Sequence, residues 1–149
     1  MIKKNRKIAM CAFMLVIFLV SGALVAFATT LYSSWRYYGP VNGFSYQNRA
    51  FVSSDYPNGV YAVAQVKPQS GGSAPAGYMG ARARLYNGSG SLVNATSWYY
   101  TNSVSWGLDV YGDDVYTTDS YYSYGQSKAY NGSGYNTYDT YQSPNVNYP

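Results

Sequence analysis

The chain has 149 residues and a formal charge of +4, and it combines 20 tyrosines with no histidine and a single cysteine. The positive charge belongs to its first residues. Positions 3–7 hold four of the 10 basic side chains, and the remaining basic side chains equal the six aspartates in number. Because nucleic-acid binding needs a surplus of cations to displace counterions from phosphate, this neutral balance argues against a nucleic-acid partner.

The side chains that most enzymes use are missing. There is no histidine anywhere and no cysteine or glutamate after residue 28, which removes the usual bases, the thiol nucleophile and the common zinc ligands. Neither a GxSxG nor an SxxK motif occurs. Paired aspartates hydrolyse glycosides only where a deep cleft raises the pKa of one of them, which is difficult to build in a chain of this size. We therefore predict a protein that is not an enzyme, with no catalytic residues and no cofactor.

Residues 1–28 have the pattern of an export signal. The chain begins with the basic stretch MIKKNRK, continues with an almost wholly apolar run over 8–28, and reaches the small-x-small sequence Ala26-Phe27-Ala28. A signal peptidase accepts such an exit, so we predict a hydrophobic signal helix that is cleaved before Thr29 and a secreted, extracellular bacterial protein. The alternative is an uncleaved membrane anchor over 8–28, with membrane contact only through this segment.

The remainder, 29–149, is expected to form a single domain without helices. It contains no glutamate and no isoleucine, and it is rich in Gly, Ser, Thr, Asn and Tyr, a composition that favours strands and turns. Cys11 lies in the apolar run, so no disulfide can form in this part and the fold must be held together by packing.

Strands are predicted wherever short apolar or alternating runs lie between turn residues. In chain order they are expected at 35–38, 44–52, 60–67, 78–86, 92–100, 104–110, 115–130 with a break near Gly125, and 135–141. Two of them alternate strictly, as half-buried strands do. Their predicted inward residues are Met79, Ala81, Ala83 and Leu85 in one, and Val104, Trp106, Leu108 and Val110 in the other.

Four Asn-Gly dipeptides, beginning at Asn42, Asn58, Asn87 and Asn131, separate these runs, and both residue types tolerate the positive φ that tight turns require. The stretch 69–75 is the one looser loop. About seven to eight short strands at this spacing predict an all-β fold, a single antiparallel β-sandwich, with a small β-barrel as the alternative.

The sequence YNGSG occurs twice, at 86–90 and at 130–134. Aligning the two copies at a spacing of 44 also matches Tyr78 with Tyr122 and Arg84 with Lys128. Two explanations remain: two hairpins that need the same turn, or a duplicated half-domain.

The tyrosines predict where recognition would occur. A buried phenol needs a hydrogen-bond partner, so a core would be filled more readily by Phe, and the excess of Tyr places most rings at the boundary with water. There they either stabilise the sheet as cross-strand neighbours or form a recognition surface. The candidate binding residues are Tyr78, Arg82, Arg84 and Tyr86 on one strand and Tyr122, Tyr124, Lys128 and Tyr130 on another.

A second candidate site is acidic. Asp109, Asp113 and Asp114 lie close together in sequence, and calcium takes carboxylate and carbonyl oxygens from such loops, although the EF-hand spacing is absent. The alternative is an ordinary hairpin turn centred on Gly112 and Asp113.

Together these observations predict a secreted, non-catalytic β-module that binds a cell-wall glycan or a surface protein through exposed Tyr and Trp. Because the outward row mixes cations with rings, it suits an anionic wall polymer. The alternatives are a secreted bacteriocin-like antagonist and a subunit of an extracellular assembly whose edge strands pair between copies.

Overall fold

The computed structural model of the chain describes residues 28–149. The predicted signal segment, with Cys11, lies outside the described residues except for its last position, Ala28. No helix in residues 28–149 is long and apolar enough to cross a membrane.

The described residues form thirteen short strands. They are β1 (Thr29–Tyr32), β2 (Arg36–Val41), β3 (Phe44–Asp55), β4 (Gly59–Pro68), β5 (Met79–Arg82), β6 (Arg84–Asn87), β7 (Leu92–Ala95), β8 (Tyr99–Tyr100), β9 (Leu108–Tyr111), β10 (Asp119–Ser123), β11 (Gln126–Tyr130), β12 (Tyr135–Asp139) and β13 (Val146–Tyr148).

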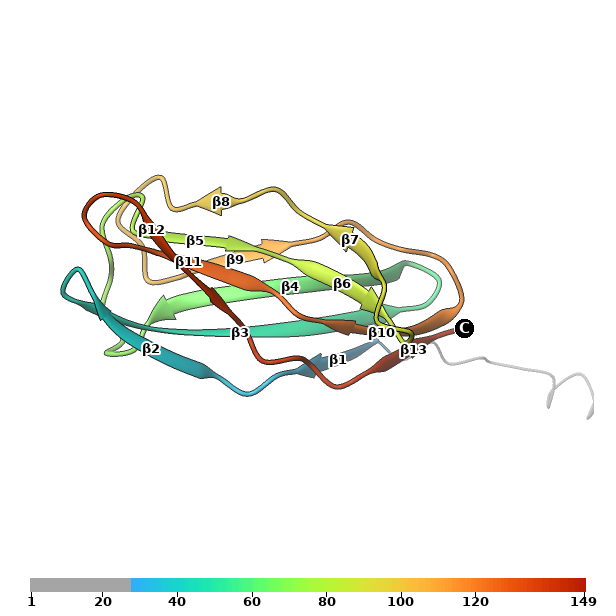
Figure 1. Ribbon diagram of the computed structural model, residues 1–149. Coiled ribbons are helices and arrows are strands. Elements are labelled where there is room, and N and C mark those ends of the chain that lie inside the picture. The colour runs from blue at the N-terminus through green and yellow to red at the C-terminus, as the bar shows by residue number, and fades with distance from the viewer. Residues whose placement is uncertain (1–27) are drawn as a thin grey trace, which may run out of the picture.

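The first sheet contains β1, β2, β3, β4 and β9, all antiparallel to their neighbours (Figure 1). β1 and β2 follow one another along the same edge of β3, where Tyr32 pairs with Phe51 and Arg36 with Asn48. They therefore act as one long edge segment that is interrupted at 33–35. β4 pairs with β3 over its full length, and β9 forms the opposite edge.

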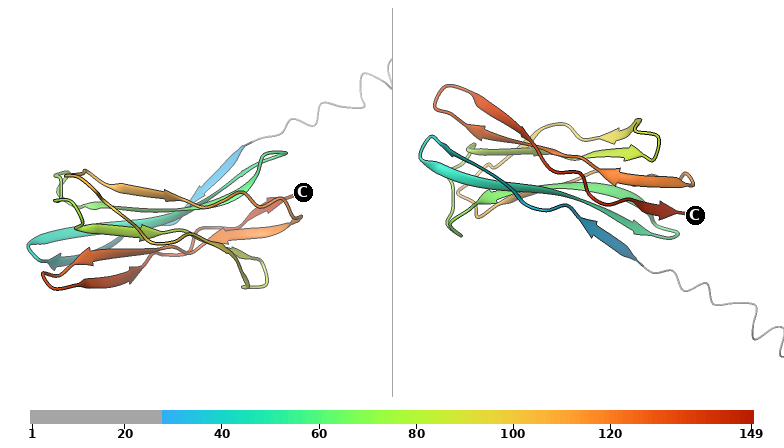
Figure 2. Two further views of the ribbon diagram at one scale, coloured as in Figure 1. Left: turned by 90° about the horizontal axis from the view of Figure 1, so that it is seen from above. Right: turned by 60° about the horizontal axis from the view of Figure 1, so that its bottom comes forward.

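The second sheet is built from two four-stranded ladders, β13-β10-β6-β7 and β12-β11-β5-β8, that continue one another. The register does not change between them. Arg82 pairs with Gln126 and Tyr86 with Tyr122, and the amide of Tyr124 donates to the carbonyl of Arg84 (3.2 Å) between these two pairs. The protein is thus an all-β sandwich of two antiparallel sheets, as predicted. It is elongated along its strands, and the C-terminal segment runs beside the N-terminal one (Figure 2).

The core lies between the inner faces of the two sheets. Met79, Ala81, Ala83 and Leu85 are all buried, which confirms the inward face predicted for this segment. They pack with inward residues of the first sheet: Tyr46, Val52, Val60, Ala62, Ala64 and Val66. Most of these side chains are small, so the two sheets can approach closely, and dense packing replaces the missing disulfides.

The four Asn-Gly dipeptides all form turns, as predicted. In the β2–β3 hairpin both Asn42 (φ 47°) and Gly43 (φ 82°) have the positive φ of a type I′ turn. In the two YNGSG copies the Asn side chain caps its own turn: the amide of Ser91 donates to Asn87 Oδ1 (2.8 Å), and the amide of Gly134 donates to Asn131 Oδ1 (2.9 Å). Both copies thus form hairpin turns that are capped by their own asparagine, although the capped amide lies four residues after Asn87 and three residues after Asn131.

Two predicted elements are wrong, and two predicted strands are shorter than expected: 92–100 is broken between β7 and β8, and 115–130 begins only at Asp119. The strand at 104–110 begins only at Leu108. Before it, Ser105 forms an isolated bridge with Ala74 and its Oγ donates to the carbonyl of Gly107 (2.6 Å), while Val104 and Trp106 are 68% and 71% exposed. The segment around Gly112 and Asp113 is not a hairpin turn. It continues along β4, since Gly112 donates to the carbonyl of Ala62 (2.8 Å) and Val115 bridges to Val60.

Of the 20 tyrosines, only Tyr46, Tyr121 and Tyr148 are buried, so most rings do lie at the boundary with water. Tyr121 donates its hydroxyl to the carbonyl of Thr117 (2.7 Å), and Tyr148 donates to the carbonyl of Pro57 (3.1 Å). The hydroxyl of Tyr46 is completely buried and has no hydrogen-bond partner within residues 28–149.

We expect Tyr46→Phe to raise the free energy of unfolding by about 1 kcal/mol, because it removes a buried hydroxyl that has no partner. Tyr121→Phe is the matched control and is expected to lower it by about 1 kcal/mol, because it breaks a made hydrogen bond. Urea unfolding of both variants measures the two changes. A Tyr46→Phe variant less stable than the unmodified protein would contradict this account.

Burial also raises the pKa of Tyr46 from its ordinary value of 10.0 to about 12. The folded state holds the phenol proton more tightly than the unfolded state does. The ionisation of Tyr46 therefore leaves the free energy of unfolding unchanged below pH 10 and lowers it as the pH rises from 10 toward 12. Tyr46→Phe should therefore lose less stability over this interval than the unmodified protein, as measured by urea unfolding at successive pH values. Parallel curves for the two proteins would show that Tyr46 does not titrate in this way.

Candidate functional site

Seven of the eight predicted binding residues lie on the outer face of the second sheet. The eighth, Tyr78, comes just before β5 and packs at the end of the sheet against Phe44 of the first sheet, with ring centroids 5.4 Å apart. Successive side chains of a strand point to opposite faces, so the burial of Met79 to Leu85 turns the residues between them outward. On the neighbouring strand, Tyr121, Ser123, Ser127 and Ala129 are buried and the alternate residues point outward. All eight candidates are partly exposed.

The register brings the two rows together as cross-strand neighbours. Tyr86 pairs with Tyr122, and their rings stack with centroids 5.4 Å apart. Tyr78 lies beside Tyr130, with centroids 5.2 Å apart. Arg84 donates from Nε to the carbonyl of Tyr124 (2.8 Å). The structure thus places these residues beside one another across the strands, a pairing that the sequence did not give.

Arg82 and Lys128 meet on a residue that sequence reasoning missed, Trp98. The Cζ atom of Arg82 is 5.3 Å from the centre of the indole ring, and Nζ of Lys128 is 4.3 Å from it. Trp98 lies in the break between β7 and β8, on the edge of the sheet. The run of aromatic residues at 98–100 was visible in the sequence, but without the strand order nothing showed that it lies beside these cations.

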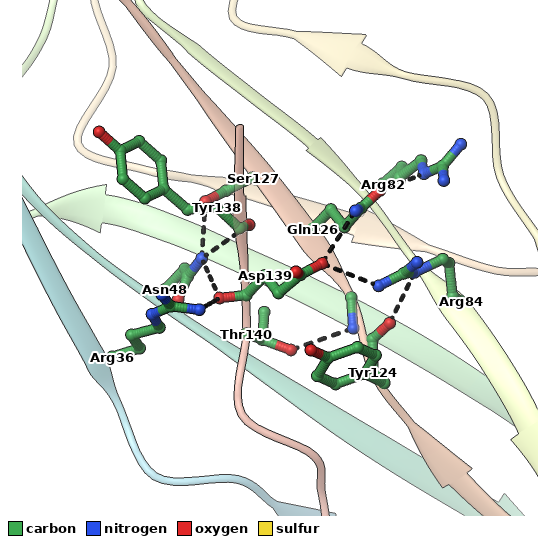
Figure 3. Close-up of polar contacts among 11 residues, drawn as sticks. Arg36, Asn48, Arg82, Arg84, Tyr124, Gln126, Ser127, Tyr138, Asp139 and Thr140 are labelled. Atoms are coloured by element: carbon green, nitrogen blue, oxygen red, sulfur yellow. Dashed lines mark hydrogen bonds and ion pairs between the residues drawn. The ribbon is translucent and has the colours of Figure 1, made fainter. Parts of the chain in front are cut away.

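A chain of polar contacts crosses the same surface (Figure 3). Arg82 donates from Nε to Gln126 Oε1 (2.9 Å), and Gln126 donates from Nε2 to Asp139 Oδ1 (2.8 Å). The same carboxylate oxygen lies 3.1 Å from Nη2 of Arg84, whose side chain is 12% exposed. We call Trp98, Arg82, Lys128, Gln126 and Asp139 the Trp98 cluster.

Asp139 also joins the two sheets through its backbone. Its carbonyl accepts a hydrogen bond from Nη1 of Arg36 (2.9 Å) and a longer one from Nδ2 of the buried Asn48 (3.4 Å), both in the first sheet (Figure 3). Next to it, the rings of Tyr38 and Tyr138 stack with centroids 3.8 Å apart. These contacts hold β12, which ends at Asp139, against the first sheet.

One end of the surface is a group of tyrosines. Tyr135 lies against Tyr130 and Tyr100, with centroid distances of 5.7 and 5.0 Å. Tyr100 lies over Gly80, where a Cβ would come within 2.8 Å of the ring, so only glycine leaves room for it. Tyr78, Tyr130 and Tyr135 line an open hollow of about 120 Å³ together with the Ala76-Gly77 backbone.

The three aspartates of the calcium hypothesis are not brought together. Asp109 accepts a hydrogen bond from Gln65 Nε2 (2.8 Å), whereas Asp114 lies against Gly59, six positions away along β4. The two residues are five positions apart on a largely extended segment, so at about 3.3 Å per residue their backbones are about 16 Å apart. Within residues 28–149 no three acidic, cysteine or histidine side chains gather as a metal site. Calcium binding stays a prediction that this geometry does not support.

Comparison of the chain with protein-family models, with curated proteins and with solved structures finds no match. The function must therefore be argued from the outer face itself.

We expect Asp139→Asn to lower the free energy of unfolding by about 1–2 kcal/mol, because the largely buried Arg84 loses a charged hydrogen-bond acceptor. Asp113→Asn is the control, since Asp113 is exposed and should change stability by less than about 0.5 kcal/mol. Thermal and urea unfolding measure both. Equal stabilities of the two variants would mean that the polar chain contributes nothing to the fold.

Proposed function

We propose that this protein is a secreted, non-catalytic β-module that binds an anionic cell-wall glycan through the outer face of its second sheet. The observation that carries the proposal is the Trp98 cluster: an aromatic ring on an accessible sheet face with two cations fixed against it. Aromatic rings offer sugars an apolar surface, and the neighbouring cations suit the phosphate or carboxylate groups that an anionic glycan carries.

The charges on this face favour an anionic ligand. Asp139 forms the only ion pair among residues 28–149, and its partner is Arg84. Arg82 and Lys128 have no acidic partner there, and Arg82 uses only its Nε in the hydrogen bond to Gln126, so its two Nη atoms are free to bind a ligand.

Most of the acidic residues lie elsewhere, at the end of the sandwich near the β3–β4 turn. Asp55 pairs with Gly59, Asp114 lies against the same glycine, and Asp119 pairs with Tyr148, whose hydroxyl reaches Pro57 in the turn. Residues 29–149 carry equal numbers of basic and acidic side chains. Because most of the acidic ones lie at the other end of the sandwich, the cations of the outer face can attract anions.

A surface protein is the second candidate partner. It is favoured by the exposed apolar side chains between β8 and β9, where Val104 and Trp106 are largely exposed. Beside them, Tyr99 of β8 and residues 108–111 of β9 line an open hollow of about 220 Å³. Exposed aromatic residues of this kind are typical anchors in protein interfaces.

An amide NMR titration of the purified protein with short oligomers of glycerol phosphate tests the glycan proposal. We expect shifts at the indole N–H of Trp98 and in β5, β11 and β12, and we expect them to shrink as salt is added. Trp98→Ala should remove this set of shifts. Tyr116→Ala is the control, because Tyr116 is 64% exposed and lies at the acidic end of the molecule.

Two results would contradict the proposal. One is a titration that leaves the second sheet unchanged with anionic oligomers of both phosphate and carboxylate type. The other is retention of the protein on isolated cell walls that Trp98→Ala and Tyr116→Ala reduce equally.

A further inference from the structure

The outer face of the first sheet carries a second copy of the same arrangement. Trp35 lies with its ring against two cations: Cζ of Arg49 is 4.4 Å from the ring centre, and Nζ of Lys67 is 4.6 Å from it. The corresponding distances at Trp98 are 5.3 and 4.3 Å. Each of these two indoles therefore contacts one arginine and one lysine.

The polar chain is repeated as well. Arg49 donates from Nε to Gln65 Oε1 (2.5 Å), and Gln65 donates from Nε2 to Asp109 Oδ2 (2.8 Å). The order of groups is Arg, Gln, Asp, and in both sheets the guanidinium Nε donates to the glutamine oxygen and the glutamine Nε2 donates to the carboxylate. We call Trp35, Arg49, Lys67, Gln65 and Asp109 the Trp35 cluster.

The positions of these residues across the sheets also agree. Each tryptophan lies in the break of an interrupted edge segment, Trp35 between β1 and β2 and Trp98 between β7 and β8. The arginine is on the next strand, the glutamine and lysine follow two residues apart on the third, and the aspartate is on the far edge. The third strands carry Gln65-Val-Lys67 and Gln126-Ser-Lys128.

Chance is a poor explanation for this agreement. Two of the three tryptophans of the chain are used in this way, and Trp106 has no cation against its ring within residues 28–149. Four of the six cations after residue 28 belong to the two clusters. A general need for ring and cation pairs does not by itself require the same five residue types in the same strand order on both faces.

We propose that the two clusters are two separate sites for the same anionic glycan, on opposite faces of the sandwich. The inference rests on the proposed function and extends it to the number of ligands. Arg49 uses only its Nε within residues 28–149, and Lys67 is exposed, so the Trp35 cluster has free cationic donors as the Trp98 cluster does. Because packed sheets lie about 10 Å apart and the sites face in opposite directions, one protein molecule bridges two glycan chains.

The two sites are not identical. Arg49 lies between two rings, since its Cζ atom is also 4.3 Å from the ring centre of Tyr32. The Trp35 cluster has no counterpart of Arg84, because Asp109 forms no ion pair within the described residues. We therefore expect two binding constants of different size rather than one.

Isothermal titration calorimetry measures the number of sites. One arm uses short glycerol phosphate oligomers and the other uses oligogalacturonate, so that recognition of phosphate is separated from recognition of carboxylate. The unmodified protein should bind two oligomers, Trp35→Ala and Trp98→Ala one each, and the double variant none. Tyr116→Ala should still bind two. The unmodified protein should also agglutinate particles coated with the polymer, and each single variant should lose this activity while it still binds.

NMR of the unmodified protein keeps the test independent of how the variants fold. The indole N–H signals of Trp35 and Trp98 should both shift on titration, and that of Trp106 should not. A single site that is lost only in Trp98→Ala would overturn this inference and leave the proposed function standing. No binding in either arm, or a single site lost only in Trp35→Ala, would overturn both.

Discussion

The register between β5–β6 and β10–β11 is the constraint on which the rest of the molecule depends. It is kept over the whole length of the paired segments, from Met79 opposite Ala129 to Asn87 opposite Tyr121. A slip by one residue would turn every inward side chain outward, because side chains alternate between the faces of a strand. The same pairing that buries Met79 and Leu85 therefore gathers the outer arginines, lysine and tyrosines on one surface. The core and the candidate site are thus formed by the two faces of the same pair of strands.

The outer faces also compensate for what the chain lacks. It has no disulfide in the described part and few large aliphatic residues, and the core between its sheets is built largely from alanine and valine. Ring stacks, cations on rings and amide-mediated polar chains tie neighbouring strands together from the outside. Each such contact contributes a fraction of 1 kcal/mol to about 1 kcal/mol, so that only their number makes them important. A face stabilised in this way is already ordered before a ligand arrives, which lowers the entropy cost of binding.

Local features were predictable from the sequence. The alternation at 78–86 gave the correct inward face, the Asn-Gly dipeptides gave the turns, and Gly125 lies at the break between β10 and β11. β1 and β13 were missed, since each is short and is held by pairing with a distant segment. The turn expected at Gly112 was wrong because hydrogen bonds to Ala62 and Val60, far away in sequence, keep this segment extended.

The equivalence of the two faces could not be found by comparing segments in chain order. In the first sheet the tryptophan comes before the arginine in the sequence, as Trp35 and Arg49. In the second sheet the tryptophan comes after the arginine, as Trp98 and Arg82. A repeat is visible in the sequence only where residues recur in the same order, as they do in the two YNGSG turns. Only strand order shows that the clusters correspond, and strand order depends on long-range pairing that local pattern does not encode.

The irregular stretch after β9 has a consequence for how molecules of this protein meet. An exposed edge strand is a template on which a further chain can add, and such addition leads to fibres. Beyond Tyr111 the edge of the first sheet loses its regular ladder and carries the carboxylates of Asp113 and Asp114. An approaching strand would meet an irregular backbone and two like charges that form no ion pair within residues 28–149. The interrupted ladder and the two carboxylates therefore make this edge a poor template for the addition of another strand.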